Sequence, residues 1–574
     1  MKKIIQYLKP YFPRMALGFC IKTGGTLAEL MLPYILSYIL AEVVFLQNIW
    51  SIVSWGLLMV IFAGLALLGN IVANRMAAKV SRNFAEKLRK DLFIKTLRLS
   101  AAQTDEFTIP SLESRITTDT YNVHNFVNMM QRMGVRAPTL LFGGVLITLF
   151  MDLYLSLAMI AMLPLIFVIV YFISRKGVPL YTKVQKSVDR MIRVVREDAQ
   201  GIRVIKALSK ADYEHRRYDK VNRNLIHDET VAGVIMGSVN PIMTFLMNGG
   251  IVAVIALSAF RVAEGLSSAE TVIAFMQYFT LISMAMMSVT RIFVMYTKSA
   301  ASANRIAEVL NSGEDLPLKT EEEYPAIKTD AHIMFENVSF SYKGKRNDLD
   351  KISFSIPRGG SVGIIGATGS GKSTLIKLLL RFYDVDEGAV YIDGRDIRTI
   401  DKEKLYAMFG TAMQYDFLYA DTIEENIRFG RAVSHDQIVH AAKIAQADDF
   451  IMSFADGYEH KLSQKGTNIS GGQKQRVLIS RALAARPEIL ILDDSSSALD
   501  YKTDAALRNA LAAHMQDTTL VTVAQRVSSI KDCDLILVLD EGKIIGIGQH
   551  EHLLETCEEY REISDSQMGG AFVE

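Results

Sequence analysis

Long apolar runs alternate with polar, charged stretches through the first half of the 574-residue chain. A helix needs about 20 mainly apolar residues to cross a bilayer, and most of these runs reach that length. We therefore predict a helical membrane domain with six spans. The runs fall at about 15–44, 52–74, 136–151, 153–173, 239–260 and 270–292. The third run is short, and its boundary with the fourth, near Asp152, is the least defined.

The stretches between the runs differ in their content of Lys and Arg. The connections at 45–51 and 151–153 lack both residue types, and the one at 261–269 has a single Arg. The connections at 75–131 and 175–230 are long, basic and mostly helical in pattern. Because Lys and Arg collect on the cytoplasmic side of membrane proteins, we predict that both lie in the cytoplasm with the N-terminus.

Each long connection is expected to fold back on itself as a pair of antiparallel helices. Arms of ~25 residues would project about 35–40 Å from the membrane, at about 1.5 Å per residue. We expect the tips at Thr117–Asn122 and Gly201–Leu208, where each arm must contact another part of the assembly. The basic, aromatic stretch Met1–Arg14 is typical of an interfacial helix, with a solvated helix end as the alternative.

Three charged residues, Lys22, Glu29 and Arg291, lie within or near the ends of apolar runs. Lys22 and Glu29 are seven residues apart and therefore share one face of a helix. A lone charge at mid-bilayer costs about 2.5–3.5 kcal/mol, which favours a water-filled or substrate-binding cavity. Alternatively, Lys22 extends to the interface and Glu29 faces a buried partner. The sequence leaves these possibilities open.

Composition agrees with a membrane protein and adds one suggestion about the substrate. Half of the residues are hydrophobic, 22% are charged, and the net charge of +1 gives no indication of nucleic-acid binding. Many of the 26 methionines lie in the last two runs beside aromatic residues. Such side chains suit a cavity for varied apolar ligands, although they also serve simply to pack helices. The three cysteines, Cys20, Cys533 and Cys557, are interpreted as free thiols.

The pattern changes completely after the last apolar run. Between residues 311 and 330 the apolar periodicity stops, and Gly, Pro and Glu punctuate the stretch. Short strands then alternate with helices, which is the pattern of an α/β domain. We predict a transmembrane domain at 1–310, a linker at 311–330 and an α/β domain at 331–574.

A phosphate-binding motif, G-x-x-x-x-G-K-[ST], stands between a predicted strand at 361–365 and a predicted helix at 375–380. Its glycines let backbone N–H groups turn toward phosphates, and the helix N-terminus adds partial positive charge. Lys372 is placed to reach the outer phosphates, and the Ser373 hydroxyl to bind Mg²⁺. The residues expected to hold the phosphates are Gly366, Gly369, Ser370, Gly371, Lys372, Ser373 and Thr374.

Two further stretches suit the same chemistry. The apolar run at 488–492 is typical of a buried parallel strand that delivers Asp493 to its C-terminal end. There the carboxylate can hold Mg²⁺, directly or through water. Ser470–Gln473 precedes a predicted helix and offers a second phosphate-binding geometry, which is a weak signal by itself.

Together these motifs resemble the ATPase domain of ABC transporters, and the whole chain is similar to half-size exporters of the multidrug type. The resemblance implies an α-helical six-span transmembrane domain followed by an α/β P-loop ATPase domain. It implies ATP and Mg²⁺ as cofactors, a place in the cell membrane with the ATPase domain in the cytoplasm, and coupling helices at the arm tips. The residues that it assigns to nucleotide are Tyr342 against adenine, Gln414, the signature residues Ser470, Gly471, Gly472 and Gln473, and Asp500 of the D-loop. For Mg²⁺ it assigns Ser373, Gln414 and the Walker B residue Asp493.

Two residues assigned to catalysis depart from the family pattern. The family has Glu after the Walker B aspartate, where this chain has Asp494, and His at the switch position, where this chain has Gln525. Loss of a well-placed general base costs roughly 10²–10⁴-fold in rate, and an amide cannot carry a proton or a positive charge. We therefore expect this chain's own site to bind ATP and to hydrolyse it slowly.

The resemblance also implies a dimer. In it, each ATP lies between the phosphate-binding loop of one chain, which the family calls the Walker A loop, and the signature motif of the other chain. The two departures favour a heterodimer with a second half-transporter. A homodimeric exporter of drugs or lipids and an ATP-gated regulatory or channel-like module are the alternatives. The expected substrate is an apolar or amphipathic small molecule, a lipid or a peptide, carried across a membrane whose lipid surrounds the spans. The sequence does not specify which of these it is.

Overall fold

The computed structural model describes residues 2–264, 269–313, 315–342, 344, 346–414 and 416–568. The chain divides into two compact units. Met1–Leu97 and Thr108–Ser312 form a helical unit, and Arg98–Phe107 and Gly313–Glu574 form an α/β unit.

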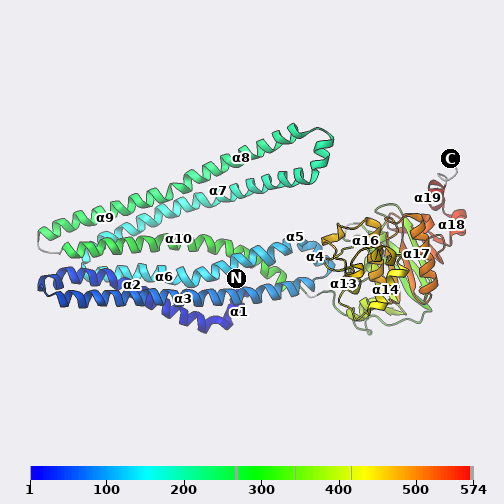
Figure 1. Ribbon diagram of the computed structural model, residues 1–574, viewed down its shortest axis with the longest axis horizontal. Helices are drawn as coiled ribbons and strands as arrows, with labels where there is room; N and C mark the ends of the chain where they lie inside the picture. Colours follow the sequence, from blue (N-terminus) through cyan, green and yellow to red (C-terminus); the bar gives the residue numbers. More distant parts are fainter. Residues whose placement is uncertain are drawn as a thin grey trace. The chain divides into compact units, whose positions relative to one another are not determined.

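Long helices build the helical unit (Figure 1). Within the described residues, five helices are long and apolar enough to cross a membrane. The fourth expected span, 153–173, is described as an apolar helix only over Leu153–Leu165, and several of its later side chains lie outside the described residues. The predicted total of six spans is therefore not confirmed. The helices are α1 (Lys2–Leu8), α2 (Phe12–Tyr38), α3 (Ile49–Leu97), α5 (Ile109–Ser114), α6 (Thr120–Met151), α7 (Leu153–Ala207), α8 (Ala211–Gly237), α9 (Val239–Ala263) and α10 (Ala269–Asn311).

Asp152 separates the third and fourth runs, at the boundary that the sequence left least defined. Its backbone is extended, with φ −154° and ψ 115°, so α6 cannot continue into α7. Its Oδ1 accepts hydrogen bonds from the backbone N–H groups of Tyr154 and Leu155, at 3.0 and 3.2 Å, and so caps α7. Its Oδ2 pairs with Arg261 Nε at 3.2 Å.

Both basic connections are helical, as predicted, but the first one turns earlier than predicted. The helix α3 ends at Leu97, and the short helix α4 (Ala101–Phe107) follows within the α/β unit. Ser100 and Gln103 form a capping box, because each side chain bonds the other's backbone N–H, at 3.2 and 3.0 Å. The expected tip at Thr117–Asn122 instead lies in a helical stretch leading into α6, so that prediction was wrong.

The second arm turns close to the predicted position. The helices α7 and α8 lie side by side (Figure 1) and are joined by residues 208–210, directly after the expected tip at Gly201–Leu208. The side chain of Leu208 is 63% exposed at this turn.

The charged residues of the apolar runs have different surroundings. Lys22 is 4% exposed, and its Nζ donates to Asn70 Oδ1 at 2.6 Å and to Asn74 Oδ1 at 3.1 Å. Glu29 pairs with Arg136 of α6, with an Nη2–Oε1 distance of 2.6 Å. Lys22 and Glu29 therefore both have partners within the protein, whereas Arg291 is exposed.

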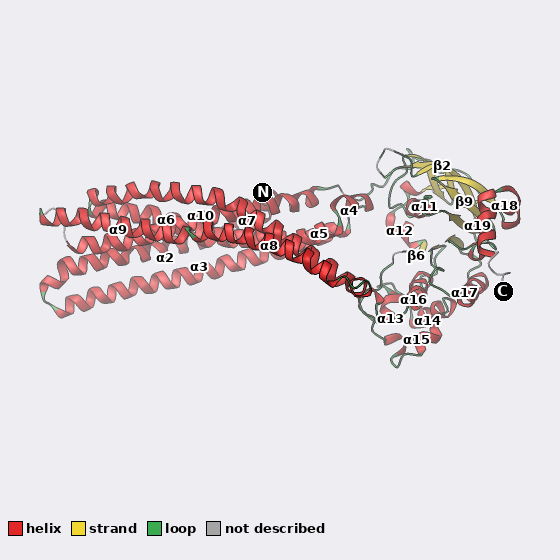
Figure 2. Cartoon of the chain, turned by 90° about the horizontal axis from the view of Figure 1, so that it is seen from above, coloured by secondary structure: helices red, strands yellow, loops and turns green. Residues whose placement is uncertain are grey.

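The α/β unit contains two sheets, which Figure 2 shows together with the helices around them. The first sheet is antiparallel, in the order β2-β1-β4-β5. The second has the order β10-β9-β3-β8-β7-β6, in which only β10 is antiparallel to its neighbour. The strands are β1 (Ala331–Phe340), β2 (Leu349–Pro357), β3 (Ser361–Gly366), β4 (Glu387–Ile392), β5 (Arg395–Asp396), β6 (Phe409–Ala412), β7 (Ile489–Asp493), β8 (Thr519–Val523), β9 (Leu535–Asp540) and β10 (Lys543–Gly548).

Two large apolar cores hold the α/β unit together. One core joins both sheets and encloses α11, whose residues Leu375, Ile376 and Leu379 are each at most 1% exposed. The other core joins the six-stranded sheet to α13, α14 and α16 through residues such as Ile427 and Leu478. The helices are α11 (Lys372–Leu379), α12 (Lys402–Ala407), α13 (Ile423–Arg428), α14 (His435–Ile444), α15 (Asp448–Met452), α16 (Gly471–Leu483), α17 (Tyr501–His514), α18 (His550–Thr556) and α19 (Glu558–Met568).

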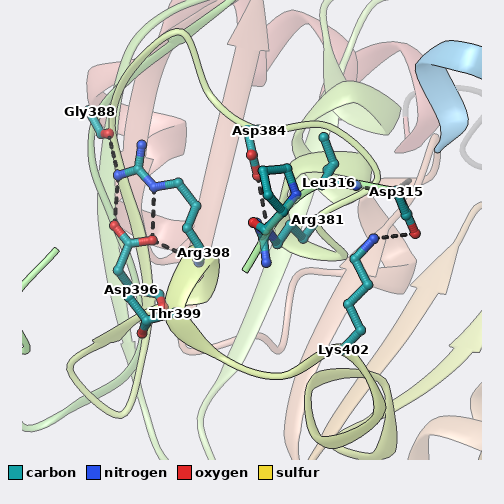
Figure 3. Close-up of polar contacts among 10 residues, drawn as sticks. Asp315, Leu316, Arg381, Asp384, Gly388, Asp396, Arg398, Thr399 and Lys402 are labelled. Atoms are coloured by element: carbon teal, nitrogen blue, oxygen red, sulfur yellow. Dashed lines mark hydrogen bonds and ion pairs between the residues drawn. The ribbon is translucent and has the colours of Figure 1, made fainter. Parts of the chain in front are cut away.

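The stretch expected to be a linker is bound along the α/β unit at several points (Figure 3). Arg381 is 1% exposed and donates to the carbonyl oxygen of Pro317 at 2.7 Å. Lys402 pairs with Asp315, and the backbone N–H of Lys319 donates to the carbonyl of Arg398 at 2.9 Å. These contacts explain why the α/β unit begins at Gly313 rather than at residue 331.

Candidate nucleotide-binding site

The predicted site lies at the C-terminal edge of the parallel strands. In the sheet register, Ile364 of β3 and Asp493 of β7 both pair with Val523 of β8. Because parallel strands end at the same edge, the loop after β3, Asp493 and Gln525 come together there. They line a cavity of ≈ 640 Å³.

Backbone crowding explains two of the loop glycines. A Cβ atom on Gly366 would lie 2.0 Å from the carbonyl oxygen of Leu539. Gly371 has φ +102°, and a Cβ there would lie 2.7 Å from a methyl group of Leu349. Both positions therefore exclude a side chain, as a loop that brings its backbone close to phosphates requires.

The polar groups of the loop fit a phosphate chain. Lys372 Nζ donates to the carbonyl oxygens of Gly366 and Ala367, both at 2.8 Å, and so lies over the loop. Burial lowers the pKa of Lys372, against the opposing effect of the Asp494 and Asp493 carboxylates. The hydroxyl of Ser370 is buried and has no hydrogen-bond partner among the described residues. A bound phosphate would supply a partner for it.

The side chains assigned to Mg²⁺ also meet at this cavity, where Ser373, Gln414 and Asp493 are among the lining residues. Their oxygen donors are the ligand type that Mg²⁺ prefers. Asp493 is 3% exposed, and burial followed by the neighbouring Asp494 carboxylate raises its pKa, whereas Lys372 opposes the rise. A divalent cation would stabilise the ionised carboxylate, so the residues fit the ion.

The two residues that depart from the family pattern contact each other. Asp494 Oδ2 accepts hydrogen bonds from the Nε2 atoms of Gln525 at 2.9 Å and Gln414 at 3.2 Å. Asp494 also has φ +52°, a left-handed conformation that is uncommon for residues other than glycine. Its backbone N–H donates to the carbonyl of Val523 at 2.9 Å, which fixes this turn against β8.

Other predicted residues lie outside the cavity lining. Tyr342 is at its margin, where its hydroxyl lies 3.4 Å from Thr374 Oγ1 and Lys377 Nζ lies 5.3 Å from its ring centroid. Ser470 and Gln473 form a capping box at the start of α16, with hydrogen bonds of 3.2 and 2.9 Å. Gly471, Gly472 and Asp500 are likewise absent from the cavity lining, and Asp500 caps α17.

Some residues of the site were not predicted from the sequence. Arg346 and Glu541 line the cavity and pair with each other at 3.2 Å. Gln567 of α19 makes two hydrogen bonds to the loop after β8 that contains Gln525, called the switch loop here. Its side-chain amide donates to the carbonyl of Gln525 at 2.7 Å and accepts from the N–H of Val527 at 2.8 Å. No local motif marks Gln567, because its role depends on the tertiary position of α19.

Comparison with known proteins identifies the family. Residues 15–286 match the ABC transporter transmembrane region, and residues 349–497 match the ABC transporter family. The uncharacterized ABC transporter ATP-binding protein YfiB of Bacillus subtilis is 33% identical over 571 residues, covering 99% of both chains. The chain belongs to the ABC transporter family.

A further relative and a solved structure resemble this chain over nearly its whole length. The putative ABC transporter ATP-binding protein exp8 of Streptococcus pneumoniae is 30% identical over 575 residues, covering 99% of this chain and 97% of that protein. A structure of a bacterial Atm1-family ABC exporter with ATP bound shares the fold, with a TM-score of 0.81, 23% identity and 99% coverage of both chains. With one transmembrane region and one ATPase region, this chain is a half-size ABC transporter that shares the fold of that exporter.

The family membership carries the general activity. This ABC transporter is a multi-pass membrane protein with a cytoplasmic ATPase unit, and it couples ATP hydrolysis to transport. Its ATPase unit uses ATP with Mg²⁺. The α/β unit is accordingly called the ATPase unit below.

Proposed function

We propose that this chain is the slowly hydrolysing half of a heterodimeric exporter for apolar or amphipathic substrates. The observation that carries the proposal is the pair of amide hydrogen bonds to Asp494. Both bonds end on the same oxygen, Oδ2, so they orient this oxygen toward two side chains of its own site rather than toward an attacking water. Asp494 is also one methylene shorter than the Glu of the family pattern, so it reaches less far toward an attacking water.

The rest of the site supports nucleotide binding without fast turnover. Lys372, Ser373 and Asp493 provide the phosphate and Mg²⁺ contacts, whereas no histidine is among the described residues that line the cavity. Gln525 can donate a hydrogen bond to a phosphate but cannot become cationic. Nucleotide bound here would therefore persist, and a second chain would supply the fast site.

Two surfaces support a partner chain. The signature residues Ser470–Gln473 lie at an exposed helix start outside the cavity, where they are available to another chain's nucleotide. Val204 and Leu208, four residues apart at the end of the second arm, are 61% and 63% exposed, and neighbouring exposed apolar side chains favour an apolar contact with a partner. We assign the coupling contact of the second arm to the partner's ATPase unit.

The substrate class rests on the facing surfaces of α6 and α10. These helices enclose a cavity of ≈ 60 Å³, lined by apolar residues together with Arg136 and Ser288. Met133 and Met284 contribute flexible side chains to it. A cavity of this size is smaller than a ligand pocket of about 300–1,000 Å³, so it would take only part of a substrate, an apolar group next to one polar or anionic group.

Purification from native membranes tests the assembly. The tagged chain should retain a second half-transporter that carries Glu and His at the two altered positions, detected by mass spectrometry. It should also retain ATP rather than ADP after washing. Recovery of this chain as its own sole partner would contradict the heterodimer. ATP-dependent uptake of lipophilic anions or fluorescent lipids into inside-out vesicles then separates an exporter from a gated or regulatory module.

A further inference from the structure

A second cluster of ligating side chains lies at the opposite end of the sheet from the nucleotide site. It consists of His332 in β1, Asp393 in the turn between β4 and β5, and Glu488 just before β7. Glu488 and Asp493 stand at opposite ends of β7, about 16 Å apart at about 3.3 Å per residue. The cluster is therefore separate from the Mg²⁺ position.

We propose that His332, Asp393 and Glu488 form a binding site for a divalent transition-metal ion of the Zn²⁺ type. One imidazole nitrogen and one oxygen of each carboxylate lie within 4.8 Å of one another. A Zn²⁺ ion binds such nitrogen and oxygen ligands at about 2.0–2.2 Å, so small side-chain rotations would close the site. Water would complete a tetrahedral set.

The buried imidazole is the observation that points to a ligand. His332 is 1% exposed, and its Nε2 is buried with no hydrogen-bond partner among the described residues. Its Nδ1 contacts Thr519 Oγ1 at 2.6 Å, and this hydroxyl also accepts from the N–H of Gly359 at 3.0 Å. A hydrogen bond at one ring nitrogen orients the other for a metal ion. Without an ion, a buried nitrogen in this position is left unpaired, which is unfavourable.

Access and charge also suit a cation. The Asp393 and Glu488 side chains are 48% and 47% exposed, so an ion could enter from solvent. Arg358 donates to one oxygen of Asp393 and to Oε2 of Glu488, the latter at 2.8 Å, and each carboxylate has a second oxygen to offer. Burial, and then the positive charge of Arg358, lowers the pKa of His332, whereas the Asp393 and Glu488 carboxylates oppose this shift. Arg358 opposes the ion by like-charge repulsion.

The ion would connect the two sheets of the ATPase unit. His332 and Asp393 belong to the antiparallel sheet, and Glu488 leads into the six-stranded sheet. A ligand that binds only the folded state stabilises it by mass action. The site is thus predicted to raise the unfolding temperature of the ATPase unit when Zn²⁺ is present, independently of ATP turnover.

Zinc titration of the full-length exporter in nanodiscs, with excess Mg²⁺, tests the site. We expect one Zn²⁺ per chain by competition with a chromophoric chelator, with binding weakened at least about tenfold in His332→Gln and Glu488→Gln. Arg358→Gln should bind Zn²⁺ at least about tenfold more tightly, because a like charge is removed. The control His514→Gln should bind as wild type.

A substitution of the buried His332 could disturb folding, so the test also relies on the variants of Arg358 and Glu488. Glu488 and Arg358 are half-exposed, so their substitutions are not expected to prevent folding, which retained ATP binding would verify. Co²⁺ in place of Zn²⁺ should give the visible absorption of a tetrahedral site, lost in Glu488→Gln. Unchanged Zn²⁺ binding in Glu488→Gln, or weaker binding in Arg358→Gln, would overturn the proposal.

Discussion

The side-chain amide of Gln525 donates a hydrogen bond to Asp494 Oδ2 across 2.9 Å. In the family pattern these two positions hold an imidazole and a longer carboxylate. In this chain the two residues at these positions are hydrogen-bonded to each other, and Gln414 donates to the same carboxylate oxygen at 3.2 Å. The two altered residues therefore form one connected arrangement rather than two independent changes.

Restoring both family residues should accelerate ATP hydrolysis at this chain's own nucleotide site. We expect Asp494→Glu with Gln525→His to shorten the lifetime of ATP bound to this chain by roughly 10²-fold or more, since a general base is regained. The lifetime is measured by filter binding after rapid dilution of the assembled exporter. Asp494→Asn serves as the control and should leave it nearly unchanged. A double variant that holds ATP as long as wild type would contradict this explanation.

The lysine of the phosphate loop should control nucleotide binding by this chain. Lys372→Ala removes a charged donor that lies within 2.8 Å of two loop carbonyls, and ATP affinity should fall about 10- to 100-fold. Photolabelling of this chain with an azido-ATP measures the change. Lys443→Ala, on the exposed face of α14, is the matched control. Equal labelling of Lys372→Ala and Lys443→Ala would exclude this role for Lys372.

The C-terminal helix should stabilise the switch loop. Gln567→Ala removes the acceptor of the Val527 N–H and the donor to the Gln525 carbonyl. Each lost hydrogen bond is worth about 1 kcal/mol, so the Val527 amide should exchange several-fold faster with deuterium. The neighbouring Ser566→Ala, which removes only a bond to the Ile563 carbonyl, is the control. Identical exchange in Gln567→Ala and wild type would show that α19 does not hold the loop.

The hydrogen bond between Tyr383 and Asp105 should stabilise the turn of the first arm within the ATPase unit. Tyr383 Oη donates to Asp105 Oδ2 at 2.6 Å, and both burial and Asp105 raise the pKa of the phenol. We expect Tyr383→Phe and Asp105→Asn each to lower the unfolding temperature, and the double variant to lose no more than one of them. Additive losses in this double-mutant cycle would mean that the two side chains do not interact.

The sequence predicted the ATPase unit well because its signals are local. The glycine-lysine loop, the apolar strand ending at Asp493 and the helix start at Ser470 each depend on neighbouring residues. The family resemblance also implied that the signature motif would serve another chain, and it lies outside this chain's cavity. The site assignments themselves remain predictions that the experiments above test.

Features that depend on distant contacts were predicted less well. The first arm tip was misplaced because the chain turns at a short helix whose start is marked only by the capping residues Ser100 and Gln103. The stretch 311–330 was predicted to be a polar linker, since nothing local shows that Arg381 would bond the Pro317 carbonyl. Arg136 as the partner of Glu29 likewise depends on packing between α2 and α6.

Phosphate release by the assembled exporter tests the asymmetry of the two sites most directly. Replacing the partner's catalytic glutamate by glutamine should abolish steady-state turnover, whereas Asp494→Asn in this chain should change it little. Equal losses from the two substitutions, or rapid phosphate release by this chain alone in liposomes, would contradict this asymmetry.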